Sequence, residues 1–595
     1  MIRKLIYLKK TSLALLIAFL GMSELSSAQY MEFEWSDEYR YTNRKTGFFS
    51  GFIGTSHSSI YLLQRNISKA KPYEKAKLML VALNKNSLTQ DTILPLKGFP
   101  ENENQAETLN SLDYLTSVVS EGRIFVFWRK LINTDSTRHE EIYAQTFKSD
   151  LKSDLPLKKV FEFVQKVGSQ SSIFDPSMCV IASNKEMDVF VLGTEHFEEG
   201  EIEFQYITLN AQLASSVLKT IPLPQKLKKI PGRITSAYDL QNNGNLFIRS
   251  TIEYSREELW ELPSIQAKTF PSLTVAKIET AEYSNLKMQG ESKTITDFSY
   301  QQLGGKTRVI GFFGDLIKDT TGVDNQGVFY ADIDDITLSA TDLNYDYFER
   351  STSNRLFPKK RRRKKNEEAP SQEEILQTRF DIEHIELMPD SSMVLFFTRV
   401  YSHEEKTSRS NLNGENVYTT QSFSKKNDLS ALRFAEKGKV VWARSVDRKA
   451  LYEGSNVTDI SVVYRYGKFI VLYGDENADL KPPRRGKKYR HLTEELAYAT
   501  FDPNSGRAKV LATDVNEPKT IKKDKRYLDP NSAVVIDGQF YFHKMRVRLN
   551  PLWTAANVIF FPTIYYSVLS GNTKLGKADF ATMRVMEGKR PRKGR

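Results

Sequence analysis

The chain has 595 residues, of which 40% are apolar and 11% are aromatic, enough to bury a large core and to exclude a wholly disordered chain. The net charge is +12, but three short stretches hold eighteen positive charges, so the rest of the chain is net negative. This balance argues against a nucleic-acid-binding face across the domain. The single cysteine, Cys179, excludes an internal disulfide and a zinc site with two cysteine ligands.

Residues 1–28 have the pattern of a secretory signal peptide. A basic start precedes an apolar run, Thr11–Met22, and Ser26–Ala28 then supplies the small residues that a signal peptidase requires. The run is shorter than the roughly 20 residues of a membrane-spanning helix, which favours a cleaved signal over a retained anchor. We therefore expect a bacterial protein that is exported to the periplasm, the outer membrane or the extracellular space.

One pattern recurs eight times along the rest of the chain. A polar or glycine-bearing turn precedes a run of β-branched and aromatic residues, which is typical of a strand covered on both faces. The eight runs are Ile60–Leu63, Arg123–Trp128, Asp188–Leu192, Asn245–Ile248, Arg308–Phe313, Met393–Phe397, Lys468–Tyr473 and Gln539–Phe542. Other strand-like segments flank most of them, as Tyr114–Val119 and Glu141–Phe147 flank the second run.

This repeat predicts an all-β protein, specifically a β-propeller of seven or eight four-stranded blades. A single four-stranded sheet leaves both faces uncovered, whereas radial packing of sheets buries those faces and ring closure removes exposed ends. Two separate β-sandwich domains are the alternative. The predicted boundaries are a lead-in at residues 29–46, the propeller at 47–585 and a basic tail at 586–595.

The repeat lapses at residues 342–377, which we interpret as a long, flexible basic insertion between blades five and six. Adjacent like charges repel one another and resist packing. A second basic loop follows the seventh run. The basic residues predicted to bind a partner are Lys359, Lys360, Arg361, Arg362, Arg363, Lys364, Lys365, Arg484, Arg485, Lys487, Lys488 and Arg490. Their alternative role is to form solvated loops that aid solubility.

Residues 551–569 form the most apolar stretch after the signal. Asn557 and Pro562 argue against a transmembrane helix there, which leaves core strands or an exposed contact for a partner as interpretations. The residues predicted to form that contact are Trp553, Ile559, Phe560, Phe561, Tyr565 and Tyr566.

Recognisable catalytic patterns are absent from the sequence. The seven histidines lack metal-binding spacing, and we find no nucleophile elbow, phosphate-binding loop or dinucleotide-binding turn. We therefore predict no catalytic residue, no cofactor and no metal ligand. The hypothesis that follows is a non-enzymatic binding or scaffold subunit of the bacterial cell envelope, with an envelope protein or membrane surface as its partner and an anionic ligand as an option. A glycan-acting enzyme with carboxylates at the mouth of the central channel is the alternative.

Overall fold

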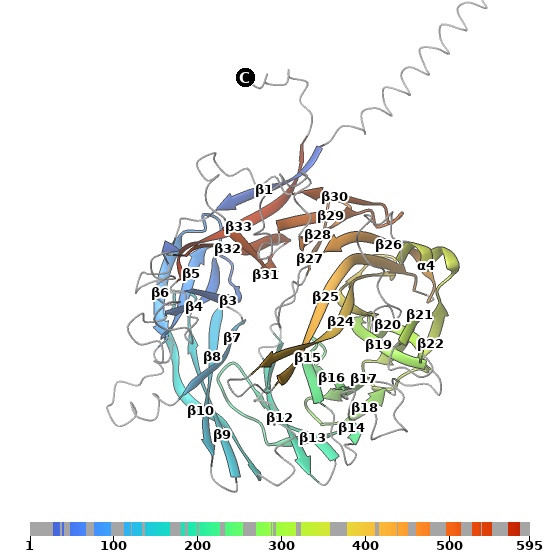
Figure 1. Ribbon diagram of the computed structural model, residues 1–595. Coiled ribbons are helices and arrows are strands. Elements are labelled where there is room, and N and C mark those ends of the chain that lie inside the picture. The colour runs from blue at the N-terminus through green and yellow to red at the C-terminus, as the bar shows by residue number, and fades with distance from the viewer. Residues whose placement is uncertain are drawn as a thin grey trace, which may run out of the picture.

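The computed structural model defines a ring of antiparallel sheets (Figure 1). The residues that it describes are 28–35, 39–40, 48–66, 77–96, 112–133 without 121, 137–166, 180–184, 189–198, 201–226, 233–253, 269–288 without 287, 293–316, 323–356, 378–410, 416–449 without 437, 460–475, 495–512, 526–549 without 537, and 569–583. These residues form eight sheets, numbered 1 to 8 from β3 onward, and the prediction of a β-propeller is confirmed.

Each sheet contributes four consecutive strand positions. The first strands are β3 (Phe48–Thr55), β7 (Asp113–Ser120), β11 (Val180–Asn184), β15 (Arg233–Leu240), β19 (Lys293–Gln302), β23 (Thr378–Leu387), β27 (Ser461–Arg465) and β31 (Arg526–Ile536). The second strands are β4 (Ser59–Asn66), β8 (Arg123–Asn133), β12 (Val189–Glu198), β16 (Asn245–Glu253), β20 (Lys306–Leu316), β24 (Met393–Ser410), β28 (Lys468–Asp475) and β32 (Gln539–Leu549). The eight predicted runs fall in these second strands.

The outer two positions complete each sheet. The third strands are β5 (Lys77–Asn84), β9 (Thr137–Phe147), β13 (Glu201–Leu209), β17 (Thr269–Lys277), β21 (Val323–Asp334), β25 (Asn416–Phe434), β29 (Glu495–Phe501) and β33 (Leu569–Met583). The fourth strands are β6 (Gln90–Leu96), β10 (Ser153–Lys166), β14 (Lys219–Lys226), β18 (Tyr283–Leu286), β22 (Asn344–Tyr347), β26 (Val440–Lys449), β30 (Ala508–Ala512) and β1 (Ala28–Trp35). A short strand, β2 (Tyr39–Arg40), also pairs with β33.

First strands of neighbouring sheets contact one another, as β19 does with β23 and β3 with β7 and β31, which places them at the centre of the ring. The second strands lie next outward, and the apolar residues of their central runs are buried where the structure describes them. Each buried apolar cluster of the described residues draws on two neighbouring sheets; Phe125 of β8 and Phe190 of β12, for example, share one cluster, with ring centroids 4.5 Å apart. The core therefore lies between the sheets, as the radial packing argument predicts.

Part of the predicted lead-in at residues 29–46 belongs to sheet 8. Its fourth strand is β1, which pairs antiparallel with β33 from Ala28 opposite Met583 to Trp35 opposite Gly576. The N-terminal strand thus joins the sheet that ends the chain, which closes the ring and pairs an edge that would otherwise be open. Figure 1 shows β1 and β33 side by side.

The first part of the predicted insertion is also regular structure. Residues 344–347 form β22, and α4 (Arg350–Leu356) packs against β26. Leu356 is 1% exposed and lies in the cluster between sheets 5 and 6, so burial of its side chain contributes to holding α4 against the ring. The basic run Lys359–Lys365 and the rest of residues 357–377 lie outside the described residues, as do the signal sequence to residue 27 and the tail at 586–595. No helix among the described residues has the length and apolar character that crossing a membrane requires.

Candidate functional site

The residues predicted to bind a partner lie in three connections between described strands. Residues 359–365 fall between α4 and β23, residues 484–490 between β28 and β29, and residues 553–566 between β32 and β33. All of them lie outside the described residues. The flanking strands nevertheless define which end of each sheet these connections leave.

The two ends of the sheets carry connections of different kinds. In an antiparallel blade, the first-to-second and third-to-fourth turns lie at one end, here called the turn face. The second-to-third connections and the passages to the next sheet lie at the other end, here called the long-connection face. Turn-face connections between described strands span at most nine residues, as between β21 and β22. At the long-connection face, 19 residues separate the end of β28 from the start of β29 and 19 separate β32 from β33, and the three predicted segments all belong to connections that leave strands at this face.

A long hairpin leaves the same face from sheet 6. Strands β24 and β25 pair as far as Ser410 opposite Asn416, whereas β23 pairs with β24 only to Tyr401 and β26 pairs with β25 only to Asn427. The arm beyond those points is therefore a two-stranded ribbon of about 30 Å, at about 3.3 Å per residue. Figure 1 shows β24 and β25 running past the other strands of their sheet. The described strands thus add a fourth extended feature to the long-connection face.

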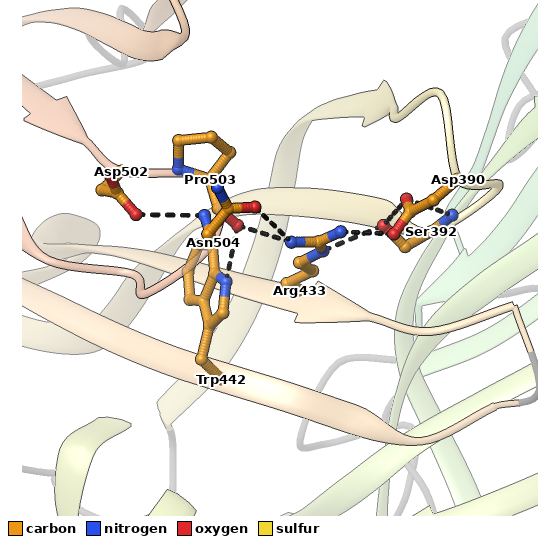
Figure 2. Close-up of polar contacts among 7 residues, drawn as sticks. All are labelled: Asp390, Ser392, Arg433, Trp442, Asp502, Pro503 and Asn504. Carbon is orange, nitrogen blue, oxygen red and sulfur yellow. Dashed lines mark hydrogen bonds and ion pairs between the residues drawn. The ribbon is translucent and has the colours of Figure 1, made fainter.

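On the turn face, side chains of one sheet donate hydrogen bonds to backbone carbonyls of the next sheet. Figure 2 shows the contact between sheets 6 and 7, where Arg433 Nη1 and Trp442 Nε1 each donate to the Pro503 carbonyl oxygen at 2.9 Å. Arg433 is held in place by Ser392 and Asp390 of its own sheet, at 2.9 and 2.5 Å. We call such a contact, from a side chain to the turn of the next sheet, a clasp.

A clasp occurs at each of the seven junctions between consecutive sheets, from sheets 1 and 2 to sheets 7 and 8. The donors differ in type, but each acceptor is a backbone carbonyl in or beside a turn of the following sheet. The contacts are Tyr61 to Ser149, Lys158 to Leu213, Tyr206 to Ile278, Asn245 to Asp335, Arg308 to Glu436, Arg433 to Pro503 and Arg465 to Gly538. Because the clasps lie on the turn face, the side chains of that face join consecutive sheets.

The third-to-fourth turns share a backbone conformation that the sequence analysis missed. Leucines close several of them with a positive φ, among them Leu88 at 55° and Leu338 at 58°, and both side chains are buried. Gly506 takes the corresponding place in sheet 7 because a Cβ there would lie 2.6 Å from the ring of Trp442. Left-handed backbone is costly for leucine, so its buried side chain must compensate. Recurrence of a leucine near the end of four of these turns, at Leu88, Leu151, Leu213 and Leu338, was the available signal.

Acidic groups do meet near the centre of the ring. The carboxylate of Asp297, on β19, forms an ion pair with Arg249 of β16 through one oxygen. Its other oxygen accepts a hydrogen bond from the Ile382 amide of β23 at 2.5 Å, beside Asp381. The pairing of β19 with β20 is shifted just before Asp297, a bulge that re-aims the side chain. Asp297 therefore links three consecutive sheets.

Burial raises the pKa of Asp297 to about 6, and the neighbouring Asp381 adds to that increase. The positive charge of Arg249 and the Ile382 amide act in the opposite direction but do not cancel the burial. The Arg249 guanidinium also lies over the ring of Phe298, 4.7 Å from its centroid. These partners leave neither oxygen of Asp297 unengaged, so we assign it a structural role.

A cleft of about 470 Å³ lies between the first strands of sheets 6, 7 and 8. His384 Nε2 lies 3.0 Å from Glu386 Oε2, and both side chains are about one-third exposed. The remaining lining is mostly apolar, with Ile460, Val462, Val463, Tyr464 and Val535 beside Ser461 and Gly538. Such a cleft can bind a group that has an apolar body and a polar head. The sequence analysis assigned no role to His384 or Glu386.

No protein-family model and no curated protein matches this chain. Among solved structures, prolyl oligopeptidase B from Galerina marginata is similar at 9% identity and a TM-score of 0.34, over 84% of this chain and 55% of that one. The chain thus spans about half of that enzyme. The β-propeller domain of the Trilobed protease from Pyrococcus furiosus is 9% identical with a TM-score of 0.32, over 81% of this chain and 100% of that one. A Bombyx mori GH32 beta-fructofuranosidase is 12% identical with a TM-score of 0.24, over 69% and 89%. Similarity this low says nothing about activity.

Proposed function

We propose that the protein is an exported, non-enzymatic β-propeller that acts as a binding or scaffold subunit in the bacterial cell envelope. It contacts a protein or membrane partner through its long-connection face. The observation that supports this proposal is the difference between the two faces. Short turns and clasps fill one face, while the connections that contain the basic and apolar segments leave the other.

The basic segments suit an anionic surface. Residues 359–365 are seven consecutive basic residues, and residues 484–490 add five more. Each such charge near an anionic membrane contributes about 1 kcal/mol of attraction, and salt screens that attraction over a Debye length of about 8 to 10 Å. The rest of the chain is net negative and repels a negatively charged partner, so such a partner is attracted mainly to the basic segments. Lipid headgroups of the envelope are the partner chemistry that this charge favours.

The apolar segment supplies a different kind of contact. Residues 553–566 contain the aromatic and aliphatic residues of the predicted contact, and they join two strands of the sheet that closes the ring. Apolar contacts persist in high salt, whereas contacts between charges weaken. The two kinds of segment are therefore distinguishable by salt washing.

The enzymatic alternative receives less support. Hydrolysis of a glycoside generally uses two carboxyl groups about 5 to 10 Å apart, one of them protonated. Both oxygens of Asp297 are engaged within the fold, and Glu386 is the carboxylate that lines the cleft. These contacts favour binding over hydrolysis.

Envelope fractionation of the full chain tests the proposal. Membranes from cells that express it are washed at low salt and then at high salt, and the protein is followed in each fraction. We expect high salt to release part of the protein, and we expect replacement of Arg361, Arg362 and Arg363 by glutamine to move that part into the low-salt wash. Replacement of Phe560, Phe561 and Tyr565 by serine should deplete the fraction that survives high salt.

A matched control removes three charges from the turn face. Glutamine at Lys85, Lys148 and Lys439 changes the net charge by the same amount but should leave the distribution unchanged. Recovery of the wild type as a free monomer in the soluble exported fraction would contradict the proposal. An equal effect of the two triple substitutions would show that net charge matters and the face does not.

A further inference from the structure

Three potential metal ligands converge on the outer half of sheet 2. His139 and Glu141 lie on β9 and Glu162 lies on β10, and one ligand atom from each lies within 4.8 Å of the other two. His139 and Glu141 are two residues apart, so they project from the same side of their strand. Glu162 stands directly opposite Glu141 in the register of the two strands.

A bulge in β10 builds this arrangement. The pairing of β10 with β9 is shifted between Lys159 and Phe161, so Lys159 stands opposite Tyr143 and Glu162 opposite Glu141. In a regular strand, residues three apart point to opposite faces, whereas the extra residue of a bulge brings them to the same face. The bulge therefore places the Glu162 carboxylate and the Lys159 ammonium on the side that carries His139.

The cluster already holds a cation. Lys159 Nζ lies 3.1 Å from Glu141 Oε1 and also contacts Glu162, while Tyr143 donates a hydrogen bond of 3.0 Å to Glu141 Oε2. Lys130 Nζ is more distant, 3.8 Å from Glu141 Oε2. The lysine side chain is 42% exposed, so its ammonium can turn out to solvent without disturbing the strands. The two carboxylates are thus preorganised around a positive charge that can be exchanged.

His139 supplies a third ligand beside the two carboxylates. A metal ion uses such a nitrogen ligand, whereas the Lys159 ammonium group does not. The His139 Nε2 atom is buried and contacts Glu162 Oε1, so the imidazole already faces one of the two carboxylates. An imidazole nitrogen between two carboxylates is a donor set typical of zinc and other divalent first-row metals. Tetrahedral zinc with bonds of about 2.0 to 2.2 Å would hold its ligand atoms about 3.4 Å apart, so the close pair of His139 and Glu162 would separate to admit the ion.

We propose that His139, Glu141 and Glu162 bind one divalent transition-metal ion, with Zn²⁺ as the best match to the ligands. The ion displaces the Lys159 ammonium and joins β9 to β10, the edge strand of sheet 2. Three protein ligands leave one position of a tetrahedral zinc for water. The site lies near the long-connection ends of β9 and β10, but the proposal does not depend on the proposed partner.

Calorimetric titration of the tag-free, chelator-treated full chain with ZnCl₂ tests the site. We expect one saturable event, which His139→Ala weakens at least about tenfold, a loss typical of disrupted metal sites. Lys159→Met should have the opposite effect and tighten binding, because it removes the competing cation. A folding defect cannot mimic this result, since it would weaken both variants.

A matched control uses the other histidine beside a glutamate. His384 pairs with Glu386 but belongs to no three-ligand group among the described residues, so His384→Ala should leave zinc binding unchanged. Absence of saturable binding in the wild type overturns the proposal. So does retention of wild-type affinity by His139→Ala, or weaker binding by Lys159→Met.

Discussion

Ala28 lies opposite Met583 in the antiparallel register of β1 and β33, so the two ends of the folded chain close the ring together. Cleavage at the site predicted from the sequence, beside Ala28, would leave the rest of β1 at the start of the chain. Closure of the propeller depends on the pairing of β1 with β33. Few contacts in the fold join residues farther apart in the sequence.

We predict that proline at both Tyr30 and Met31 destabilises the ring. Alternate amides of an edge strand point toward its partner, so two adjacent prolines must remove at least one hydrogen bond to β33. The free energy of unfolding should fall by at least about 1 kcal/mol in urea titrations. The same pair at Asn43 and Arg44, outside β1 and β2, serves as the control. Equal stability of the two variants would show that β1 does not close the ring.

The clasp between sheets 6 and 7 predicts non-additive mutations. Arg433 and Trp442 donate to one acceptor, the Pro503 carbonyl oxygen, so loss of either donor leaves that oxygen bonded. Arg433→Met and Trp442→Phe should each cost about 1 kcal/mol, whereas the double variant should cost about 1 kcal/mol more than their sum. Denaturant unfolding of the four proteins measures this coupling. Strict additivity would mean that the two donors do not share the acceptor.

Asp297 predicts a specific pH dependence of stability. Its pKa is about 6 in the folded protein, above the ordinary aspartate value, so the folded state takes up a proton more readily than the unfolded state. This group therefore contributes most below the ordinary aspartate pKa, and its contribution is lost as pH rises through about 6. Relative to Asp297→Asn, the wild type should gain stability when pH falls from about 7 to about 5.

Asp334 provides a control of opposite sign. Hydrogen bonds from the Thr337 and Ile336 amides and the Thr337 hydroxyl lower the pKa of Asp334, which lies exposed in a turn. Its contribution is present above the ordinary aspartate pKa and is lost as pH falls through the lowered value. Asp334→Asn should therefore show the same change in stability as the wild type between about pH 5 and about pH 7. A wild-type protein that loses stability relative to Asp297→Asn on acidification would contradict the assignment.

Substitutions at Leu338 distinguish the energetic cost of its backbone conformation from the stabilisation that its buried side chain provides. Its φ of 58° favours glycine, but its side chain is 3% exposed and belongs to the cluster between sheets 4 and 5. Loss of this buried side chain should cost about 2 to 5 kcal/mol in Leu338→Ala. Leu338→Gly should be about 1 kcal/mol more stable than Leu338→Ala because glycine tolerates a positive φ. Thermal unfolding compares the two variants, and greater stability of the alanine variant would exclude a left-handed turn.

The second strands could be predicted from the sequence because they are buried on both faces. Phe125 and Val126 are neighbours in β8 and both are fully buried, facing different sheets, so a continuous apolar run was the correct signal. The closing strand β1 was missed although residues 31–35 alternate apolar and acidic residues. It lies outside the eight repeats and pairs with the far end of the chain, and local patterns do not encode such pairing.

The clasps and the proposed metal site could not be predicted for a different reason. Tyr61 and Arg433 occupy comparable roles but share no side-chain chemistry, and their acceptors are backbone carbonyls that exist at every residue. Glu162 joins His139 only because the bulge in β10 shifts the register, and a search for histidine spacing does not detect cross-strand ligands. Both features depend on register between strands, which the repeat pattern leaves undetermined.

The central claim is that the protein uses its long-connection face to bind a partner. Photo-cross-linking in intact cells tests this claim most directly. One photoreactive residue is placed at Ser410, at the end of the β24–β25 arm, and in a second protein at Ile336, which is 73% exposed on the turn face. The account predicts a discrete cross-linked envelope component from Ser410 and none from Ile336. Cross-links from Ile336 alone, or from neither position, would contradict it.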